Sequence, residues 1–313
     1  MSFGFGTFAG ADGAAYPGLV VDDTVRDLRP EFTSTLAILQ DWDATLPRLH
    51  ELAAEGATGE PLAALRPLPP VEPSGQILCG GANYYKHLHQ MIHAHMRREG
   101  DTRPDDEVRA EAVERANRRK TSEDPFFFVG LASALCGADD DVILWGPGVE
   151  HDWELELAVV MGRGGRAIPE SDVPAHVAGY TIVNDVSTRD VMFRPGFPMT
   201  DFAMTKLRPT FKPAGPYIVP AEFVPAYRSL QIRLDVNGDP MQNEGVDDII
   251  YGVEELVAYI SRVVDLRAGD LILTGSPAGN AAHHGKRWLK PGDVMEGSIT
   301  GLGVQRNTCV APS

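Results

Sequence analysis

The sequence predicts an α+β fold, mainly β, with a rolled or barrel-like sheet in its C-terminal part and a smaller N-terminal α/β domain. Residues 126–313 contain a series of short apolar segments separated by turn signals such as NGDP, RAGD and KPGD, against one strong helical pattern. Residues 1–75 end in LRPLPPVEPSG, a proline-rich stretch typical of a boundary, because proline stiffens the chain and removes backbone donors. Apolar residues make up 43% of the 313 residues, which is enough for a sizeable core.

The N-terminal domain, residues 1–75, begins with the strand-like segments FGFGTF and GLVVDD. The stretch TLAILQDWDATLPRLHELA, residues 35–53, then predicts a helix. We expect the remaining chain, residues 76–313, to form the second and larger domain.

A polar segment, residues 88–125, lies near the start of the larger domain. Asp105 to Lys120 predict a helix, because Pro104 stands at its start, acidic residues fill its first turn and basic residues fill its last turn. The apolar face of this helix is thin, which leaves two interpretations open. The segment is either a solvated surface helix or a mobile lid-like insertion over a site.

The predicted strands of the larger domain follow from short apolar runs and from alternation of apolar and polar residues. They are VILWG, WELELAVVMG, AGYTIVND, GPYIVP, LQIRLDVNG, DLILTG, DVMEGSI and GVQRNTCV. The clear helix of this part is YGVEELVAYISRV, residues 251–263.

Charge and cysteine usage exclude several classes of protein. A net charge of −16 argues against a nucleic-acid partner, since phosphate binding needs clustered Lys and Arg. No run approaches the roughly 18 apolar residues of a membrane span, and the first residues lack the pattern of a secretory leader. Three cysteines, far apart and without a CxxC pair, indicate a reducing compartment, so we expect a cytoplasmic protein.

Two glutamates in HDWELELAVVMG carry the strongest chemical signal. Glu154 and Glu156 project to the same face of a strand because side chains alternate with a period of two. Neighbouring unpaired carboxylates repel each other and lose hydration, and a bound cation relieves both effects. The alternative is an edge strand with both charges in solvent.

Asp185 offers a third carboxylate at the end of the predicted strand GYTIV. Two Glu and one Asp form an all-oxygen site suited to Mg²⁺ or Mn²⁺ and unsuited to zinc. The alternative for Asp185 is an ordinary helix N-cap.

A series of motifs in fixed order resembles the fumarylacetoacetate hydrolase family over nearly the whole chain. The motifs are GANYYKH, FFFVGLASAL, HDWELELAVVMG, GYTIVNDVSTRD, LTGSPAG and LKPGDVMEGSITGLGVQRN. The resemblance implies the rolled, barrel-like sheet of that family, one Mg²⁺ or Mn²⁺ ion per chain and a homodimer.

The resemblance also implies roles for individual residues. The residues expected to bind the metal are Glu154, Glu156 and Asp185. The expected catalytic residues are His87, from the NY-x-x-H segment, and Lys206, nine residues before Gly215-Pro216. The expected substrate-binding loop contains Thr274, Gly275 and Ser276. Arg189 is a further candidate for binding an anionic substrate, although Asp190 beside it offers a structural partner.

Three positions depart from the family pattern. Gln90 stands where many hydrolytic members have a Glu that pairs with the histidine, and an amide cannot accept a proton at neutral pH. Gly130 stands where relatives commonly have a Lys, and Met192 where a Gln is frequent. These changes indicate a divergent substrate or reaction.

The histidine-rich segment His87 to His95 leaves three interpretations open: a second metal site, a replacement base at His89 or His93, or surface histidines.

The reaction that this pattern predicts first is metal-dependent hydrolysis of a C–C bond in an acylpyruvate-like or 1,3-dicarbonyl substrate, through an enolate that the metal stabilises. Decarboxylation of a 2-keto acid, or an isomerase, tautomerase or hydratase reaction, shares the same enolate and is the alternative. The partner is then a small keto acid or diketone, with no role for nucleic acid or membrane.

Overall fold

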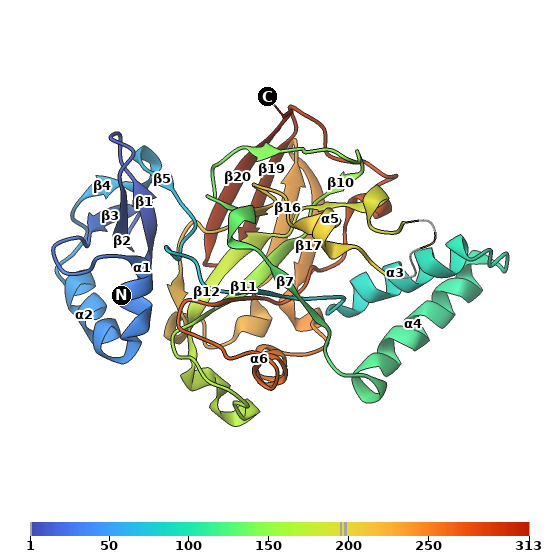
Figure 1. Ribbon diagram of the computed structural model, residues 1–313, viewed down its shortest axis with the longest axis horizontal. Coiled ribbons are helices and arrows are strands. Elements are labelled where there is room, and N and C mark those ends of the chain that lie inside the picture. The colour runs from blue at the N-terminus through green and yellow to red at the C-terminus, as the bar shows by residue number, and fades with distance from the viewer. Residues whose placement is uncertain (1, 195, 197–198, 313) are drawn as a thin grey trace.

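The N-terminal unit is a five-stranded sheet covered by two helices. The computed structural model describes residues 2–194, 196 and 199–312 of the chain. The strands follow the order β4-β3-β2-β1-β5. Their bounds are Gly4–Ala9 (β1), Ala15–Val21 (β2), Thr24–Asp27 (β3), Glu60–Pro61 (β4) and Arg66–Pro67 (β5). Figure 1 shows this unit, in blue, at the opposite end of the molecule from helices α3 and α4.

The single helix expected over residues 35–53 is two helices, α1 (Thr35–Gln40) and α2 (Trp42–Ala54). Asp41 separates them with φ −126° and ψ 46°, outside the helical region. The break lets Ile38 and Leu39 from α1 and Leu49 from α2 enter the same buried cluster. Periodicity alone does not detect such a break, because both helices keep an apolar face.

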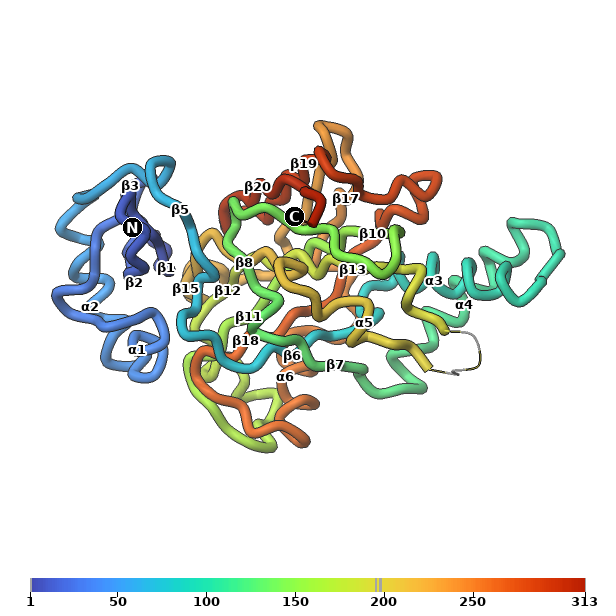
Figure 2. Tube along the Cα trace, turned by 45° about the horizontal axis from the view of Figure 1, so that its top comes forward, coloured from blue at the N-terminus to red at the C-terminus, as the bar shows by residue number. Residues whose placement is uncertain are grey.

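Two larger sheets form the body of the protein and curl around its core (Figures 1 and 2). The first has the order β15-β12-β11-β18-β6-β7. Its strands are Val219–Pro220 (β15), Val177–Asn184 (β12), Leu155–Met161 (β11), Leu271–Leu273 (β18), Ile77–Gly80 (β6) and Phe127–Gly130 (β7). The second has the order β17-β16-β19-β20-β9. Its strands are Asp239–Gly245 (β17), Gln231–Val236 (β16), Val294–Ile299 (β19), Gly303–Val310 (β20) and Val142–Ile143 (β9).

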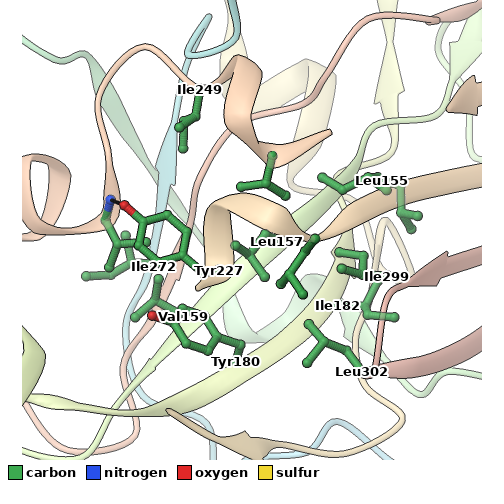
Figure 3. Close-up of a cluster of buried hydrophobic side chains, with 14 of the residues drawn as sticks. Leu155, Leu157, Val159, Tyr180, Ile182, Tyr227, Ile249, Ile272, Ile299 and Leu302 are labelled. Carbon is green, nitrogen blue, oxygen red and sulfur yellow. Dashed lines mark hydrogen bonds between the residues drawn. The ribbon is translucent and has the colours of Figure 1, made fainter. Parts of the chain in front are cut away.

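The main core lies between these two sheets. Leu155, Leu157 and Val159 project from one face of β11 into this core, as the alternation of the sequence predicts. Figure 3 shows them packed with Ile182 of β12 and with other buried side chains, among them Ile299 of β19. On the other face, Ala158 and Val160 belong to the cluster that contains the N-terminal strands and helices α1 and α2.

Short elements complete the fold. Two-stranded ladders join β10 (His151–Asp152) to β13 (Ser187–Thr188) and β14 (Lys212–Pro213) to β8 (Leu135–Cys136). The remaining helices are α3 (Tyr85–Arg98), α4 (Asp105–Ser122), α5 (Phe202–Lys206) and α6 (Val253–Ser261). Helices α3 and α4 pack against each other and project from the body (Figure 2). Within the described ranges, no helix is long and apolar enough to cross a membrane.

The fold class is confirmed: the protein is mixed, with more strand than helix and a curled half-barrel sheet. The division at residue 75 stays a prediction, and one observation bears on it. Phe5 of β1 shares a buried cluster with Ile218, and their backbones form a β-bridge. The N-terminal unit therefore packs closely on the larger sheet.

Candidate metal centre

Three carboxylates meet where strands β11 and β12 lie side by side. Glu154 immediately precedes β11, Glu156 lies within it, and Asp185 immediately follows β12. The antiparallel register sets Leu155 opposite Asn184, and the Asp185 N–H donates to the Glu154 carbonyl at 2.8 Å. One oxygen from each carboxylate lies within 4.8 Å of the others.

The burial of these carboxylates decides between the two interpretations of the E-x-E motif. Glu154 is 7%, Glu156 2% and Asp185 0% exposed, so the alternative of a solvent-facing edge strand is wrong. Asp185 caps no helix either, because the short strand β13 follows it and the next helical turn has Thr188 at its N-cap. The N-cap interpretation of Asp185 is therefore wrong as well.

Three cations point into the cluster. The Lys206 ammonium lies 2.6 Å from Glu154 Oε2 and 2.6 Å from Asp185 Oδ2, so it bridges these two carboxylates. Lys212 contacts the other oxygen, Asp185 Oδ1. Arg189 contacts Glu154 Oε1 and donates through Nε to Asp152 Oδ2 at 2.8 Å. Within the site these three cations face four carboxylates, including that of Asp152.

Glu154 and Glu156 differ in their electrostatic surroundings. Burial by itself would raise the pKa of Glu154, but the nearby Lys206 and Arg189 hold it below its ordinary value. Burial, followed by the charges of Asp185 and Glu154, raises the pKa of Glu156 well above its ordinary value. Glu156 accepts a hydrogen bond from the Gly275 N–H at 2.8 Å, and no ion pair reaches it from any described residue.

These contacts fit a divalent cation. The donor set is all-oxygen and carries three carboxylates, which suits Mg²⁺ or Mn²⁺. The bridging ammonium of Lys206 marks a position where positive charge is favourable, and Glu156 is a buried carboxylate without a counter-ion. Among residues 2–194, 196 and 199–312, no other group of His, Cys, Asp and Glu side chains converges in this way. The second metal site considered for the histidine-rich segment is thus not found in the described chain.

His87 lies in the first turn of helix α3 and is buried. Burial lowers its pKa to about 4, so its imidazole is neutral at pH 7. Its Nδ1 and the Gln90 Oε1 are buried, and neither has a hydrogen-bond partner among the described residues. Two other histidines of the segment have surface partners: His93 contacts Asp105 at 2.8 Å, and His95 contacts Glu99 at 3.3 Å. The Nε2 of His89 is buried and has no hydrogen-bond partner among the described residues. The catalytic role of His87 stays a prediction.

The loop expected to bind substrate is buried beside the metal centre. Thr274 Oγ1 donates to the Leu157 carbonyl at 2.9 Å, which ties the loop to strand β11. Gln242 Nε2 donates to Ser276 Oγ at 3.1 Å. Gly275 contacts Glu156, so this loop orients a candidate metal ligand, and its role towards substrate stays a prediction.

The expected structural partner of Arg189 is wrong. Asp190 accepts a hydrogen bond from the Val149 N–H at 2.9 Å, whereas Arg189 pairs with Asp152 and Glu154. Asp152 is a site residue that the sequence interpretation missed. The sequence pattern could have identified it, because Asp152 stands two residues before Glu154 and so continues the alternation that places Glu154 and Glu156 on one face. Lys212 was also missed, and no motif or spacing in the sequence distinguishes it.

The structure thus combines a curled sheet with a buried acidic centre of two glutamates and one aspartate from neighbouring strands, a group that could hold a metal ion. The chain belongs to the fumarylacetoacetate hydrolase family: the family model of the fumarylacetoacetate (FAA) hydrolase C-terminal domain matches residues 76–310.

Similar proteins differ in their reactions. The chain is 32% identical over 295 residues to the mitochondrial oxaloacetate tautomerase of Bos taurus, covering 94% of this chain and 84% of that protein. It is 33% identical over 307 residues to the 2,4-didehydro-3-deoxy-L-rhamnonate hydrolase of Sphingomonas sp., covering 95% of this chain and 93% of that protein. The crystal structure of maleylpyruvate hydrolase from Sphingobium sp. SYK-6, in complex with manganese(II) and pyruvate, superposes on this chain with a TM-score of 0.75 at 25% sequence identity. The superposition covers 99% of this chain and 100% of that one. The family relationship thus indicates an enzyme and leaves the reaction open.

Proposed function

We propose that this chain is a divalent-metal-dependent enzyme that forms the enolate of a 2-oxo acid and moves a proton on it, in an isomerase or tautomerase reaction. The observation that carries this proposal is the state of His87. It is a buried, neutral imidazole close to the acidic centre, and Gln90 gives it no carboxylate partner. Such a group can accept and return one proton, which is all that tautomerisation requires.

The metal would be held by Glu154, Glu156 and Asp185. Mg²⁺ or Mn²⁺ in this place supplies a Lewis acid that polarises a carbonyl and favours the enolate. His87 takes a proton from the carbon next to the carbonyl and returns it to another atom of the substrate. Lys206, fixed by its contacts to Glu154 and Asp185, supplies positive charge where negative charge develops on oxygen.

Arg189 supports the choice of an anionic substrate. Its guanidinium is held by Asp152 and Glu154, so it needs no reorganisation to face an anion. The side chain keeps 21% of its surface exposed, whereas that of Lys206 keeps 4%. Arg189 is therefore the more accessible cation of the two.

Hydrolysis of a C–C bond in an acylpyruvate-like substrate is the second candidate. Two hydrolases among the similar proteins favour it, one of them bound to manganese(II) and pyruvate. Gln90 weighs against it, because the family resemblance implies a Glu at this position, paired with the histidine, in many hydrolytic members.

The test is proton NMR in D₂O with a panel of 2-oxo acids, acylpyruvates and 1,3-diketones, with Mn²⁺ removed after quenching. We expect deuterium to enter at the carbon beside the carbonyl of a 2-oxo acid in the metal-loaded enzyme, without chain cleavage and faster than in the EDTA-treated enzyme. Glu156→Gln, which weakens the donor set, is the matched control.

Cleavage of an acylpyruvate at a rate above that of deuterium exchange identifies a hydrolase, and release of CO₂ identifies a decarboxylase. Either result would overturn the proposed reaction.

A homodimer is proposed with support from an apolar edge patch, defined as the exposed residues Phe126, Val129 and Leu131 on and beside strand β7. Among the described residues, strand β7 pairs only with β6, so its other edge is free. Phe128 and Phe202 stack at 4.5 Å next to this patch. Exposed apolar side chains along a free strand edge are typical of an interface.

A cytoplasmic location is proposed from the cysteines. Cys79, Cys136 and Cys309 are all buried and unpaired, which suits a reducing compartment. Fractionation of cells that express the tagged chain tests this location, and enrichment in another compartment would contradict it.

A further inference from the structure

Lys212 is a fully buried lysine that no motif identifies. It lies in strand β14, beside Leu135 of β8, and its side chain has no exposed surface. Among the described residues, its ion pair is with Asp185 Oδ1. The ammonium of Lys206 instead bridges Glu154 and Asp185 Oδ2. Lys212 therefore holds Asp185 from the second oxygen, away from the bridging position that suits a cation.

Gly130 faces the stem of Lys212. Gly130 is buried at the end of β7, opposite Ile77 of β6. A Cβ atom at position 130 would lie 3.0 Å from Lys212 Cε and 2.8 Å from Ile77 Cγ2, closer than ordinary van der Waals contact. A side chain at position 130 therefore excludes Lys212 from its present path, unless the lysine shifts by a few tenths of an ångström and Ile77 moves as well.

We propose that Lys212 is a positioning residue for Asp185, and that its side chain reaches the acidic centre from strand β14 through the space that Gly130 leaves open. Because position 130 carries no side chain, the stem of Lys212 passes beside β7 without a clash. The ammonium then meets Asp185 from the side opposite Lys206.

The role of Lys212 follows from its contacts. Asp185 is fully buried, and a buried carboxylate needs partners that fix its orientation. Lys206 is shared with Glu154, whereas the ion pair of Lys212 is with Asp185, so Lys212 sets the rotation of that carboxylate. Removing the partner of a metal-binding side chain typically lowers the metal affinity about 10- to 100-fold.

The test uses Mn²⁺ binding by calorimetry and thermal unfolding of the metal-free protein. Neither readout depends on which reaction the enzyme performs, so failure here is distinct from failure of the proposed function. Lys212→Met keeps most of the stem and removes the charge, and Lys212→Ala removes both. We expect both variants to bind Mn²⁺ about 10- to 100-fold more weakly than the wild type. Affinity within threefold of the wild type, or tighter binding, would overturn the positioning role.

Gly130→Ala in three backgrounds tests the exclusion. The backgrounds are the wild type, Lys212→Met and Lys212→Ala. The new contact with Ile77 occurs in all three, so a difference in how far the unfolding temperature falls reports on Lys212. We expect Gly130→Ala to lower the unfolding temperature in the wild type and in Lys212→Met, and to lower it less in Lys212→Ala. An equal decrease in all three would overturn the exclusion. If neither Lys212 variant folds, Gly130→Ala alone decides: unchanged Mn²⁺ affinity and unfolding temperature would contradict the proposal, and loss of affinity would support it.

The double variant Lys212→Ala/Gly130→Lys tests whether an ammonium delivered through this space is what positions Asp185. A lysine at position 130 should recover Mn²⁺ affinity relative to Lys212→Ala, because it returns an ammonium to the same space. Absence of any recovery would show that an ammonium in this space does not position Asp185, and would overturn the proposal.

Discussion

The backbone N–H of Gly275 donates a hydrogen bond of 2.8 Å to Oε2 of Glu156. Gly275 has φ +97°, a conformation that favours glycine, and a Cβ there would lie 3.0 Å from the Cβ of Asn83. The loop that resemblance assigned to substrate binding thus also fixes the carboxylate that has no counter-ion. The turn that orients Glu156 is therefore the same turn that is proposed to contact the substrate.

Lys206→Met is expected to lower the stability of the metal-free protein while increasing its stabilisation by Mn²⁺. Removing one partner of a buried ion pair costs about 3 kcal/mol or more, because the charge left behind is unpaired. A cation binding between Glu154 and Asp185 then no longer competes with an ammonium. Thermal unfolding with and without Mn²⁺ measures both effects.

The control for this prediction is Lys120→Met, which removes an exposed ion pair with Glu255 and is expected to change stability by less than about 1 kcal/mol. A Mn²⁺-induced increase in unfolding temperature smaller in Lys206→Met than in the wild type would show that Lys206 does not compete with a bound cation.

His87→Ala is expected to reduce kcat by about 100-fold or more with little change in Mn²⁺ affinity, because general base catalysis typically contributes that much. Gln90→Glu should retain activity, or raise hydrolysis, by giving the imidazole a carboxylate partner. His95→Ala is the matched control on the same helix, since His95 is exposed and paired with Glu99. Full turnover by His87→Ala would place the base elsewhere.

The sequence predicted the strands of the body well because two sheets pack face to face, so alternation and apolar runs report burial directly. The turn signal NGDP does lie at a turn, where Asn237 and Gly238 adopt positive φ between β16 and β17. Strand β17 itself was missed, since DPMQNEG carries neither alternation nor an apolar run. Its assignment depends on pairing with β16, which is a tertiary property.

The convergence of the three candidate metal ligands was predictable for a similar reason: parity places Glu154 and Glu156 together, and a strand end supplies Asp185. The cations around them were predicted only in part. Lys206 was implied by the family resemblance, whereas Lys212 reaches the site through the space beside Gly130, which no local pattern describes. The roles of the site residues stay predictions until they are tested.

Stability should fall as pH decreases from about 6.5 towards 4. Burial lowers the pKa of both His87 and His151 to about 4, below the ordinary value of 6.5. Between these values the unfolded chain binds more protons than the folded one, so acid favours unfolding. Each histidine contributes about 2 kcal/mol of this loss by pH 5.

His151→Gln isolates one of these contributions. The decrease in unfolding free energy between pH 7.5 and pH 5, measured by urea denaturation, should be about 2 kcal/mol smaller than in the wild type. An identical pH dependence in both proteins would show that His151 is protonated in the folded state.

Val129→Lys is expected to convert a dimer into a monomer. Val129 is 57% exposed in the apolar edge patch, and a charge there opposes burial in an interface. Val304→Lys, on the other sheet and 51% exposed, is the control that should stay dimeric. Analytical ultracentrifugation at micromolar concentration decides, and a monomeric wild type would remove the proposal of a homodimer.

The central claim is that Glu154, Glu156 and Asp185 bind one divalent cation, and anomalous diffraction from a Mn²⁺-soaked crystal tests it most directly. We expect a single strong peak per chain, with one oxygen of each carboxylate at roughly 2.0–2.3 Å, and the Lys206 ammonium moved away from its bridging position. A crystal in which the anomalous signal lies elsewhere, while Lys206 still bridges Glu154 and Asp185, would contradict the account.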